Sequence, residues 1–253
     1  MANKPTLSIV IPVYNEYATV RTLLDRVYDF DLPGIKKQFV IIESNSKDGS
    51  RAVVQAFARG KDNVTVILED HPGGKGTAMR KGFAAATGDI VLIQDADLEY
   101  DVADYPKLIQ PILDGTTDFV LGSRHSEDTG LVFSGVRQFQ GEERAFAYFM
   151  NFGELIFHTF FNVLYGTHLK DPTTMYKVFR RSLLDEVHLT GQYFELDFEI
   201  VGKFVRNGHV PLEIPIHYNS RGMKEGKKVS VSRDVIRWVQ MLLKVRFTPK
   251  DKL

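Results

Sequence analysis

The sequence predicts an α/β protein with a mostly parallel central sheet and helices on both of its faces. Short apolar segments recur through the first half of the chain, and most are continuously apolar, as strands buried on both faces are. Helical patterns separate them at intervals of roughly 25–30 residues, which is typical of right-handed βαβ units. The predicted strands are Leu7–Val13, Phe39–Ile42, Val64–Leu68, Ile90–Ile93 and Phe119–Leu121.

Two helices are predicted between these strands, because apolar residues recur there at three- and four-residue spacing. The first helix follows the Leu7–Val13 strand, and the second ends before Gly88. Their apolar positions are Val20, Leu23, Leu24 and Val27 in the first, and Met79, Phe83 and Ala86 in the second.

Length and composition limit the classes of protein that fit. The chain has 253 residues, of which 43% are hydrophobic, enough for the core of one large α/β domain. Its 32 basic and 32 acidic residues balance, so no nucleic-acid partner is expected. The absence of cysteine excludes disulfides, thiolate zinc sites and cysteine nucleophiles. No apolar stretch reaches the about 18 residues of a spanning helix, so any membrane contact would be peripheral.

Polar residues follow the predicted strands at their carboxyl ends, where α/β sheets bind ligands. The segments are Tyr14-Asn15-Glu16, Glu43-Ser44-Asn45-Ser46, Glu69-Asp70, Gln94-Asp95-Ala96-Asp97 and Gly122-Ser123-Arg124. All but the last carry carboxylates, and the last carries an arginine. A sheet edge this rich in acids requires a cation or many hydrogen-bond donors.

Asp95 and Asp97 are the first candidates for a metal site. They follow the strand Ile90–Ile93, and alternation along an extended chain would place both carboxylates on one side. Hard oxygen ligands suit Mg²⁺ or Mn²⁺, and Glu99 could join them. The alternative is an acidic turn that binds no metal.

Gly73-Gly74-Lys75-Gly76-Thr77 precedes a predicted helix, and glycines before a helix suit phosphate binding. The spacing matches neither a Walker A loop nor a dinucleotide-binding loop, so a simple turn is the alternative. Two more segments also have plain interpretations. Asn15 could cap the first helix, and Glu43–Ser50 could be an ordinary capped turn.

The second half of the chain has a different organisation. Residues 125–143 have little periodicity and are predicted to form a long loop. Arg144–Tyr165 is predicted to be a helix that is apolar nearly all round, so it either is buried or lies against lipid. Its narrow polar stripe consists of Arg144, Asn151, Glu154, His158 and Asn162. His125, His158 and His217 show no spacing typical of metal ligands and are interpreted as structural or incidental.

The C-terminal segment is predicted to be a basic amphipathic helix. Arg233, Arg237, Lys244 and Arg246 interrupt an apolar pattern that includes Trp238. Such a helix can lie on anionic lipid, or it can pack on the core with its charges in water.

In this order, the segments resemble family 2 glycosyltransferases of the GT-A fold, and most closely the polyprenyl (dolichyl) phosphate mannose and glucose synthases. The resemblance covers about residues 6–247. It rests on Ile11–Glu16, Glu43–Ser50, Gly74-Lys75-Gly76, Gly88-Asp89, Gln94–Tyr100, Gly122-Ser123-Arg124, Tyr176–Phe179 and Glu225–Lys228.

The resemblance implies a binding site for a nucleotide sugar. Pro12, Tyr14 and Glu16 would line the pocket for base and ribose. Glu43 would belong to the same pocket, although the family usually has aspartate there. Lys75 would bind the donor as well.

The resemblance also assigns the metal and the phosphates. Asp95 and Asp97 match the motif that binds Mg²⁺ or Mn²⁺ and the donor diphosphate, with Glu99 as a third ligand. Arg124 matches an arginine that contacts phosphate and would act in catalysis together with Asp97. Arg144 matches an arginine near the acceptor phosphate.

Two further matches lie near the end of the resemblance. Arg221 and Lys227 match a basic loop that would contact the donor diphosphate or the acceptor phosphate, although a solvated run of charge is the alternative. Asp197 matches an acidic position that could be catalytic. Alternatively, Glu195 and Glu199 are surface residues one turn apart on a helix.

The implied activity is inverting transfer of mannose or glucose from GDP-mannose or UDP-glucose to a polyprenyl phosphate. The expected location is cytoplasmic, peripheral at the inner face of the membrane. The expected organisation is one domain, with a donor-binding half at 1–124 and an acceptor-binding half at 125–253. A saccharide hydroxyl as acceptor would require a general base, for which Asp197 is the candidate. A nucleotidyltransferase, or a protein that binds a sugar nucleotide without turnover, would also fit parts of this pattern.

Overall fold

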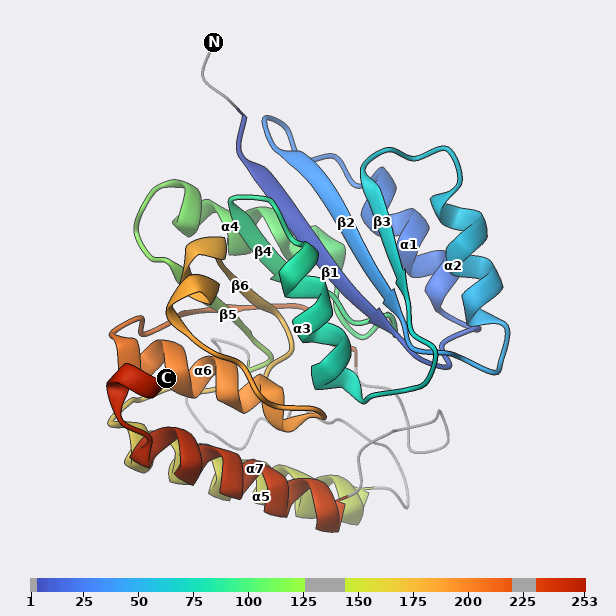
Figure 1. Cartoon of the computed structure of the whole chain (residues 1–253). Helices are drawn as coiled ribbons and strands as arrows, with labels where there is room; N and C mark the ends of the chain where they lie inside the picture. Colours follow the sequence, from blue (N-terminus) through green and yellow to red (C-terminus); the bar gives the residue numbers. More distant parts are fainter. Residues whose placement is uncertain (1–3, 126–143, 220–230) are drawn as a thin grey trace.

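The computed structural model shows a seven-stranded sheet covered by helices on both faces (Figure 1). It describes residues 4–125, 144–219 and 231–253, and of residues 144–151 and 231–233 it describes the backbone alone. The strand order is β3-β2-β1-β4-β6-β5-β7. The strands are β1 (Thr6–Val13), β2 (Lys36–Glu43), β3 (Val64–Leu68), β4 (Ile90–Ile93), β5 (Phe119–Ser123), β6 (Lys177–Arg180) and β7 (Leu212–Pro215).

All five predicted strands are present, and the sheet is mostly parallel as predicted. The pairs β1–β2, β2–β3, β1–β4 and β5–β7 are parallel, whereas β6 runs antiparallel to both β4 and β5. One expectation fails at β3, which is not buried on both faces. It lies at the edge of the sheet, so its side chains are half-buried or exposed although its sequence is apolar.

Helices form a layer on each face of the sheet. The helices are α1 (Val20–Asp29), α2 (Ser50–Ala58), α3 (Lys75–Ala85), α4 (Tyr105–Leu113), α5 (Arg144–Tyr165), α6 (Glu195–Asn207) and α7 (Val231–Phe247). Side chains of α1, α2 and α4 pack on one face, and those of α3, α5, α6 and α7 on the other. Successive side chains of β1 point to opposite faces of the sheet, so Ile9 and Ile11 pack with α1, α2 and α4, and Val10 packs with the helices on the other face.

The two long helices of the second half, α5 and α7, lie side by side on the outside of the second layer (Figure 1). Phe161 of α5 and Leu242 of α7 are fully buried toward the core. Each helix also carries exposed large apolar side chains; these are Phe152, Ile156 and Val163 on α5, and Val235, Ile236, Leu243 and Phe247 on α7. Neither of the two alternatives predicted for α5, burial in the protein or contact with lipid, describes the whole helix, because one side of it is buried and another side is exposed. Of the helices in the described part of the chain, none combines the length and apolarity needed to cross a bilayer.

The polar stripe predicted on α5 has a structural role in its described part. Asn162 accepts from the backbone N–H of Leu169 at 2.9 Å, and His158 lies 3.1 Å from the Thr173 hydroxyl. The stripe therefore faces the segment that leads from α5 to β6.

Candidate functional site

The carboxyl ends of β1, β2 and β4 meet at one edge of the sheet, because these strands are parallel neighbours. The chain leaves β1 for β2 on one side and β4 lies on the other, so the strand order reverses at β1. Ligands of open α/β sheets bind at such a reversal. Tyr14 is exposed at this edge, and Pro12 is half-buried.

The loop after β1 is joined to the loop after β2. Asn15 has a φ of 49°, and its backbone N–H donates to Ser46 Oγ at 2.9 Å. Its side chain accepts from the Lys47 N–H at 3.0 Å. The predicted helix cap is therefore wrong, since Thr19 is the residue before α1 and Asn15 instead joins the two loops. The Glu16 N–H donates to Ser50 Oγ at 2.9 Å, which positions Glu16 beside the start of α2.

Glu43 is fully buried at the end of β2. One carboxylate oxygen accepts from the Ser46 N–H at 2.7 Å, and the other pairs with the guanidinium of Arg51. Arg51 also donates to the backbone carbonyl of Glu69. Glu43 thus stabilises the loop after β2, and a base contact by Glu43 stays a prediction.

Asp95 and Asp97 lie in a turn after β4, not in an extended segment. Strand alternation therefore does not apply to them, because β4 ends at Ile93 and Leu98 has a φ of 63°. The charges of both aspartates nevertheless act on the same cation, the ammonium of Lys75. Gln94 stabilises the turn, because its side-chain amide donates to the backbone carbonyl of Asp95 at 2.9 Å. The carbonyl oxygen of the same side chain accepts from the hydroxyl groups of two buried tyrosines, Tyr105 and Tyr176.

Lys75, the first residue of α3, contacts this turn. Its Nζ lies 2.6 Å from Oδ1 of Asp95. Burial alone would lower the pKa of Lys75, but the charges of Asp95, Asp197 and Asp97 outweigh burial and raise the pKa. The structure therefore brings four sequence-predicted site residues together.

Lys177 adds a second cation to this group. It is fully buried, and its Nζ lies 3.6 Å from Oδ1 of Asp197. It also donates to the Thr174 carbonyl. Burial lowers the pKa of Lys177, and although Asp197 opposes this effect, the charge of Lys75 adds to it. The signal for Lys177 was present in the Tyr176–Phe179 motif, but the sequence did not show that the lysine faces Asp197.

Arg124 lies at the centre of a second, buried network. Its Nε and backbone N–H donate to Oδ2 of Asp171 at 2.8 and 2.9 Å. Its Nη2 lies 2.7 Å from both Asp171 Oδ1 and Glu154 Oε1, and it also donates to Thr173 Oγ1 at 2.6 Å. The ring of Tyr218 lies 5.4 Å from the guanidinium carbon. These contacts fix the guanidinium, and its predicted contact with a phosphate stays a prediction.

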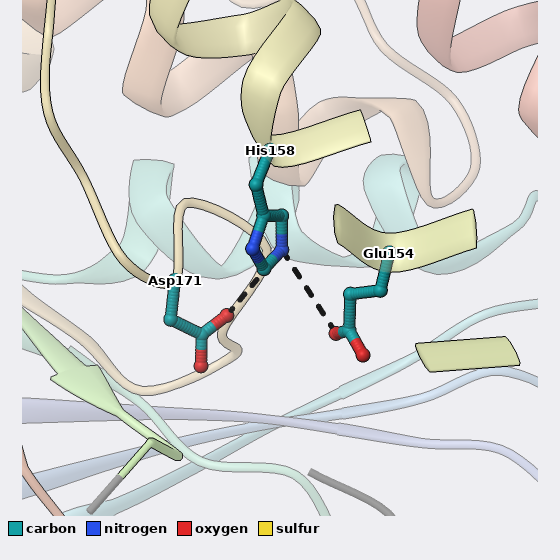
Figure 2. Close-up of side chains that lie close together, drawn as sticks. All are labelled: Glu154, His158 and Asp171. Carbon is teal, nitrogen blue, oxygen red and sulfur yellow. Dashed lines mark ion pairs between the residues drawn. The ribbon is translucent and has the colours of Figure 1, made fainter. Parts of the chain in front are cut away.

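Glu154, His158 and Asp171 also form a group with the ligand types of a metal site (Figure 2). Their ligand atoms lie within 4.8 Å of one another, and no other group of three in the described residues meets this limit. The guanidinium of Arg124 already bonds to both carboxylates, so a metal would displace an arginine. Burial lowers the pKa of His158, and the opposing charges of Asp171 and Glu154 do not reverse this. We interpret the group as an ion-pair network.

Glu99 is tied to the segment after β7. Its carboxylate accepts from the Tyr218 hydroxyl at 2.7 Å, and its backbone carbonyl accepts from the Asn219 N–H at 2.9 Å. Asp97 Oδ1 accepts from the Glu99 N–H at 3.2 Å. Asp95, Asp97 and Glu99 do not all lie within the 4.8 Å limit, so a metal here would take fewer protein ligands and more from the donor. Mg²⁺-type sites commonly use one or two carboxylates plus substrate phosphates.

The alternative interpretation of Glu195 and Glu199 as surface residues is wrong, because both are buried at the start of α6. Glu195 accepts from the Gln192 and Tyr193 N–H groups at 2.9 and 3.0 Å. Glu199 accepts from the Gly191 N–H at 2.7 Å. Both carboxylates therefore stabilise the loop that packs against the start of α3.

Some predicted residues fall outside the described part of the chain. These are Arg221 and Lys227, the side chain of Arg144, and the predicted loop beyond His125.

Two curated relatives have similar sequences. The dolichol-phosphate mannosyltransferase of Saccharomyces cerevisiae is 31% identical over 126 residues, which are 49% of this chain and 46% of that protein. The dolichol-phosphate mannosyltransferase of Pyrococcus furiosus is 27% identical over 225 residues, 88% of this chain and 60% of that protein. The chain thus spans only about half of these relatives' length.

A solved structure and a family profile also match the chain. Glucosyl-3-phosphoglycerate synthase from Mycobacterium tuberculosis, in complex with Mn²⁺, UDP and glucosyl-3-phosphoglycerate, matches with a TM-score of 0.68 at 18% identity. The match covers 97% of this chain and 81% of that chain, and it confirms the predicted GT-A fold. The profile described as Glycosyl transferase family 2 matches residues 8–188, which is most of the chain. The chain therefore belongs to glycosyl transferase family 2.

Proposed function

We propose that this protein is a metal-dependent, inverting glycosyltransferase that moves a hexose from a nucleotide sugar to a polyprenyl phosphate at a membrane surface. The observation that carries the proposal is the group of Asp95, Asp97, Asp197 and Lys75 at the carboxyl ends of the parallel strands of a family 2 chain. The 1–124 half would bind the donor, and the 125–253 half would bind the acceptor.

Asp95 and Asp97 would hold Mg²⁺ or Mn²⁺ against the donor diphosphate. The residues fit such an ion, because Asp95 already pairs with a cation, the ammonium group of Lys75. Oxygen ligands of this type are those that both ions prefer. When bound, the metal would stabilise the charge of the departing nucleoside diphosphate. Tyr14, Pro12, Glu16 and Glu43 would line the pocket for base and ribose. GDP-mannose and UDP-glucose are the two donors proposed.

The phosphate acceptor is supported by the surroundings of Asp197. This carboxylate is almost fully buried and faces Lys177, so its position balances the charge of the lysines. A phosphate acceptor is ionised near neutral pH and attacks the anomeric carbon without a strong general base. A sugar hydroxyl would need such a base, and Asp197 would have to leave this pairing to serve. The names of both curated relatives point to the same class of acceptor.

A panel of donors and acceptors tests the proposal. UDP- and GDP-linked glucose and mannose would each be incubated with Mn²⁺ and either polyprenyl phosphate or soluble glycans. We expect a lipid-linked hexose from one of the donors. Product on soluble glycans alone would overturn the acceptor proposal and return Asp197 to the role of general base.

Arg144→Ala tests the acceptor side. We expect transfer to polyprenyl phosphate to fall by a factor on the order of 10–1000, since a charge-assisted bond to phosphate is lost. Donor binding and slow donor hydrolysis should be nearly unchanged. Loss of donor binding with intact acceptor kinetics would place Arg144 at the donor instead.

The outward apolar side chains of α5 and α7 are the proposed contact with the inner face of the membrane. They lie next to exposed Arg237, Lys244 and Arg246, a combination suited to anionic lipid. The double variant Ile236→Glu/Phe247→Glu should bind acidic liposomes on the order of 10- to 100-fold more weakly, because two exposed apolar anchors are lost. Val210→Glu, at an exposed valine outside both helices, is the control. Equal co-sedimentation of all three proteins would exclude this surface.

A further inference from the structure

Lys75 and a divalent cation would compete for the same carboxylate. The Lys75 ammonium lies 2.6 Å from Oδ1 of Asp95, with side chains that are 14% and 15% exposed. This is a short, charge-assisted hydrogen bond in a mostly dry environment. The Oδ1 lone pair that accepts the ammonium proton is not available to a metal, so bidentate binding by Asp95 is excluded while Lys75 is paired with it. An ammonium and a divalent ion on one carboxylate would also repel each other strongly at low dielectric.

The backbone of Lys75 is held by contacts that do not involve its ammonium group. Gly74 has a φ of 90°, and a Cβ on it would lie 2.5 Å from the carbonyl oxygen of Gln192. The Thr77 N–H donates to the same carbonyl at 3.0 Å. These contacts hold the start of α3 against the loop before α6. Among the described residues, the ammonium has two further contacts, with Met175 Sδ at 3.6 Å and the Phe194 ring at 5.7 Å, and the charges of Asp197 and Asp97 act on it from a longer range. Transfer of the ammonium to another anion would break the ion pair with Asp95 and would leave the contacts that hold the helix unchanged.

Lys177 and Lys75 form direct ion pairs with different carboxylates, Lys177 with Asp197 and Lys75 with Asp95. The Lys177 ammonium is fully buried and bonded to the Thr174 carbonyl, so Asp197 keeps a cation at 3.6 Å whatever Lys75 does. The contacts of the described residues pair Asp95 with Lys75 alone. If Lys75 left, Asp95 would lose its direct ion pair, whereas Asp197 would keep its direct ion pair with Lys177.

We propose that Lys75 is an exchangeable counter-ion of the metal site. Its ammonium neutralises Asp95 until a nucleotide sugar binds, then moves to the diphosphate and leaves Asp95 to the divalent cation. The inference rests on the proposed function. It makes metal and donor bind cooperatively, because each favours the state in which Lys75 has left Asp95.

The test measures Mn²⁺ binding directly, by electron paramagnetic resonance, with no sugar and no acceptor. Wild type is compared with Lys75→Met, which keeps the length of the side chain but removes its charge. Without nucleotide, the variant should bind Mn²⁺ roughly 5- to 50-fold more tightly than wild type. The factor by which Mn²⁺ raises the affinity for UDP or GDP, measured by calorimetry, should shrink accordingly. Lys75→Arg keeps the positive charge and should not gain Mn²⁺ affinity.

Lys81→Met is the matched control. Lys81 lies on the same helix and also pairs with a carboxylate at 2.6 Å, but that carboxylate is Glu69. It should leave Mn²⁺ affinity unchanged. Unchanged or weaker Mn²⁺ binding by a folded Lys75→Met would overturn the inference alone and make Lys75 a fixed support of Asp95. Failure of wild type to bind Mn²⁺ even with UDP or GDP would instead contradict the proposed metal site, and the inference with it.

Discussion

Asp97→Asn is expected to lower turnover by a factor on the order of 1,000 or more. The substitution removes the negative charge that would hold the metal against the donor diphosphate, and the metal held there would stabilise the negative charge of the leaving group in the transition state. The turn itself should survive, because the asparagine side-chain oxygen can still accept from the Glu99 N–H as Asp97 does. Turnover at saturating Mn²⁺ is the measurement.

The matched control for this prediction is Asp114→Asn. Asp114 is an exposed carboxylate directly after α4 that accepts only from the Gln110 side chain among the contacts described. The turnover of Asp114→Asn should equal that of wild type. If Asp97→Asn is folded and fully active, or if wild type is active in excess chelator, the metal is not part of the reaction.

Arg124→Met is expected to destabilise the fold by about 3–5 kcal/mol, because it leaves Asp171 and Glu154 as unpaired carboxylates in the interior. Urea unfolding measures the loss. Arg180→Met removes a guanidinium that pairs with Asp118 at the surface, so it should cost about 1 kcal/mol or less. A loss in Arg124→Met as small as the one expected for Arg180→Met would show that the Arg124 network contributes little to stability.

The same network predicts a dependence on pH. Burial alone would raise the pKa of Asp171, but its pairing with Arg124 lowers that pKa well below the ordinary value of a carboxyl group. The carboxylate therefore contributes stability at neutral pH, and this contribution is lost as the pH falls below about 4, where the unfolded chain takes up the proton first. Asp171→Asn should lose less stability than wild type between neutral and acidic pH.

The first half of the fold was predictable because each strand is short, apolar and followed by a helical pattern. The sequence did not reveal β6 and β7, because charged residues begin and end β6 and a glutamate interrupts the apolar residues of β7. The edge position of β3 was also not predictable, because an apolar run does not tell how many neighbours a strand will have.

The candidate site was predicted in part. Asp95, Asp97, Lys75 and Asp197 were named from motifs, and the structure brings them together. Their mutual contacts were not predictable, because Lys75 and Lys177 come from segments about 100 residues apart. The polar stripe of α5 pointed to Glu154 and His158, but only the fold shows that they face Arg124 and Asp171 rather than a ligand.

The most direct test of the central claim is the mass of both products after incubation with Mn²⁺, the preferred nucleotide sugar and polyprenyl phosphate. The account predicts a lipid phosphate that has gained one hexosyl group, an equal amount of nucleoside diphosphate, and an anomeric configuration opposite to that of the donor. A nucleoside monophosphate would show transfer of a sugar phosphate instead. Release of pyrophosphate would show a nucleotidyltransferase, and either result would contradict the proposed transfer of a hexose to phosphate.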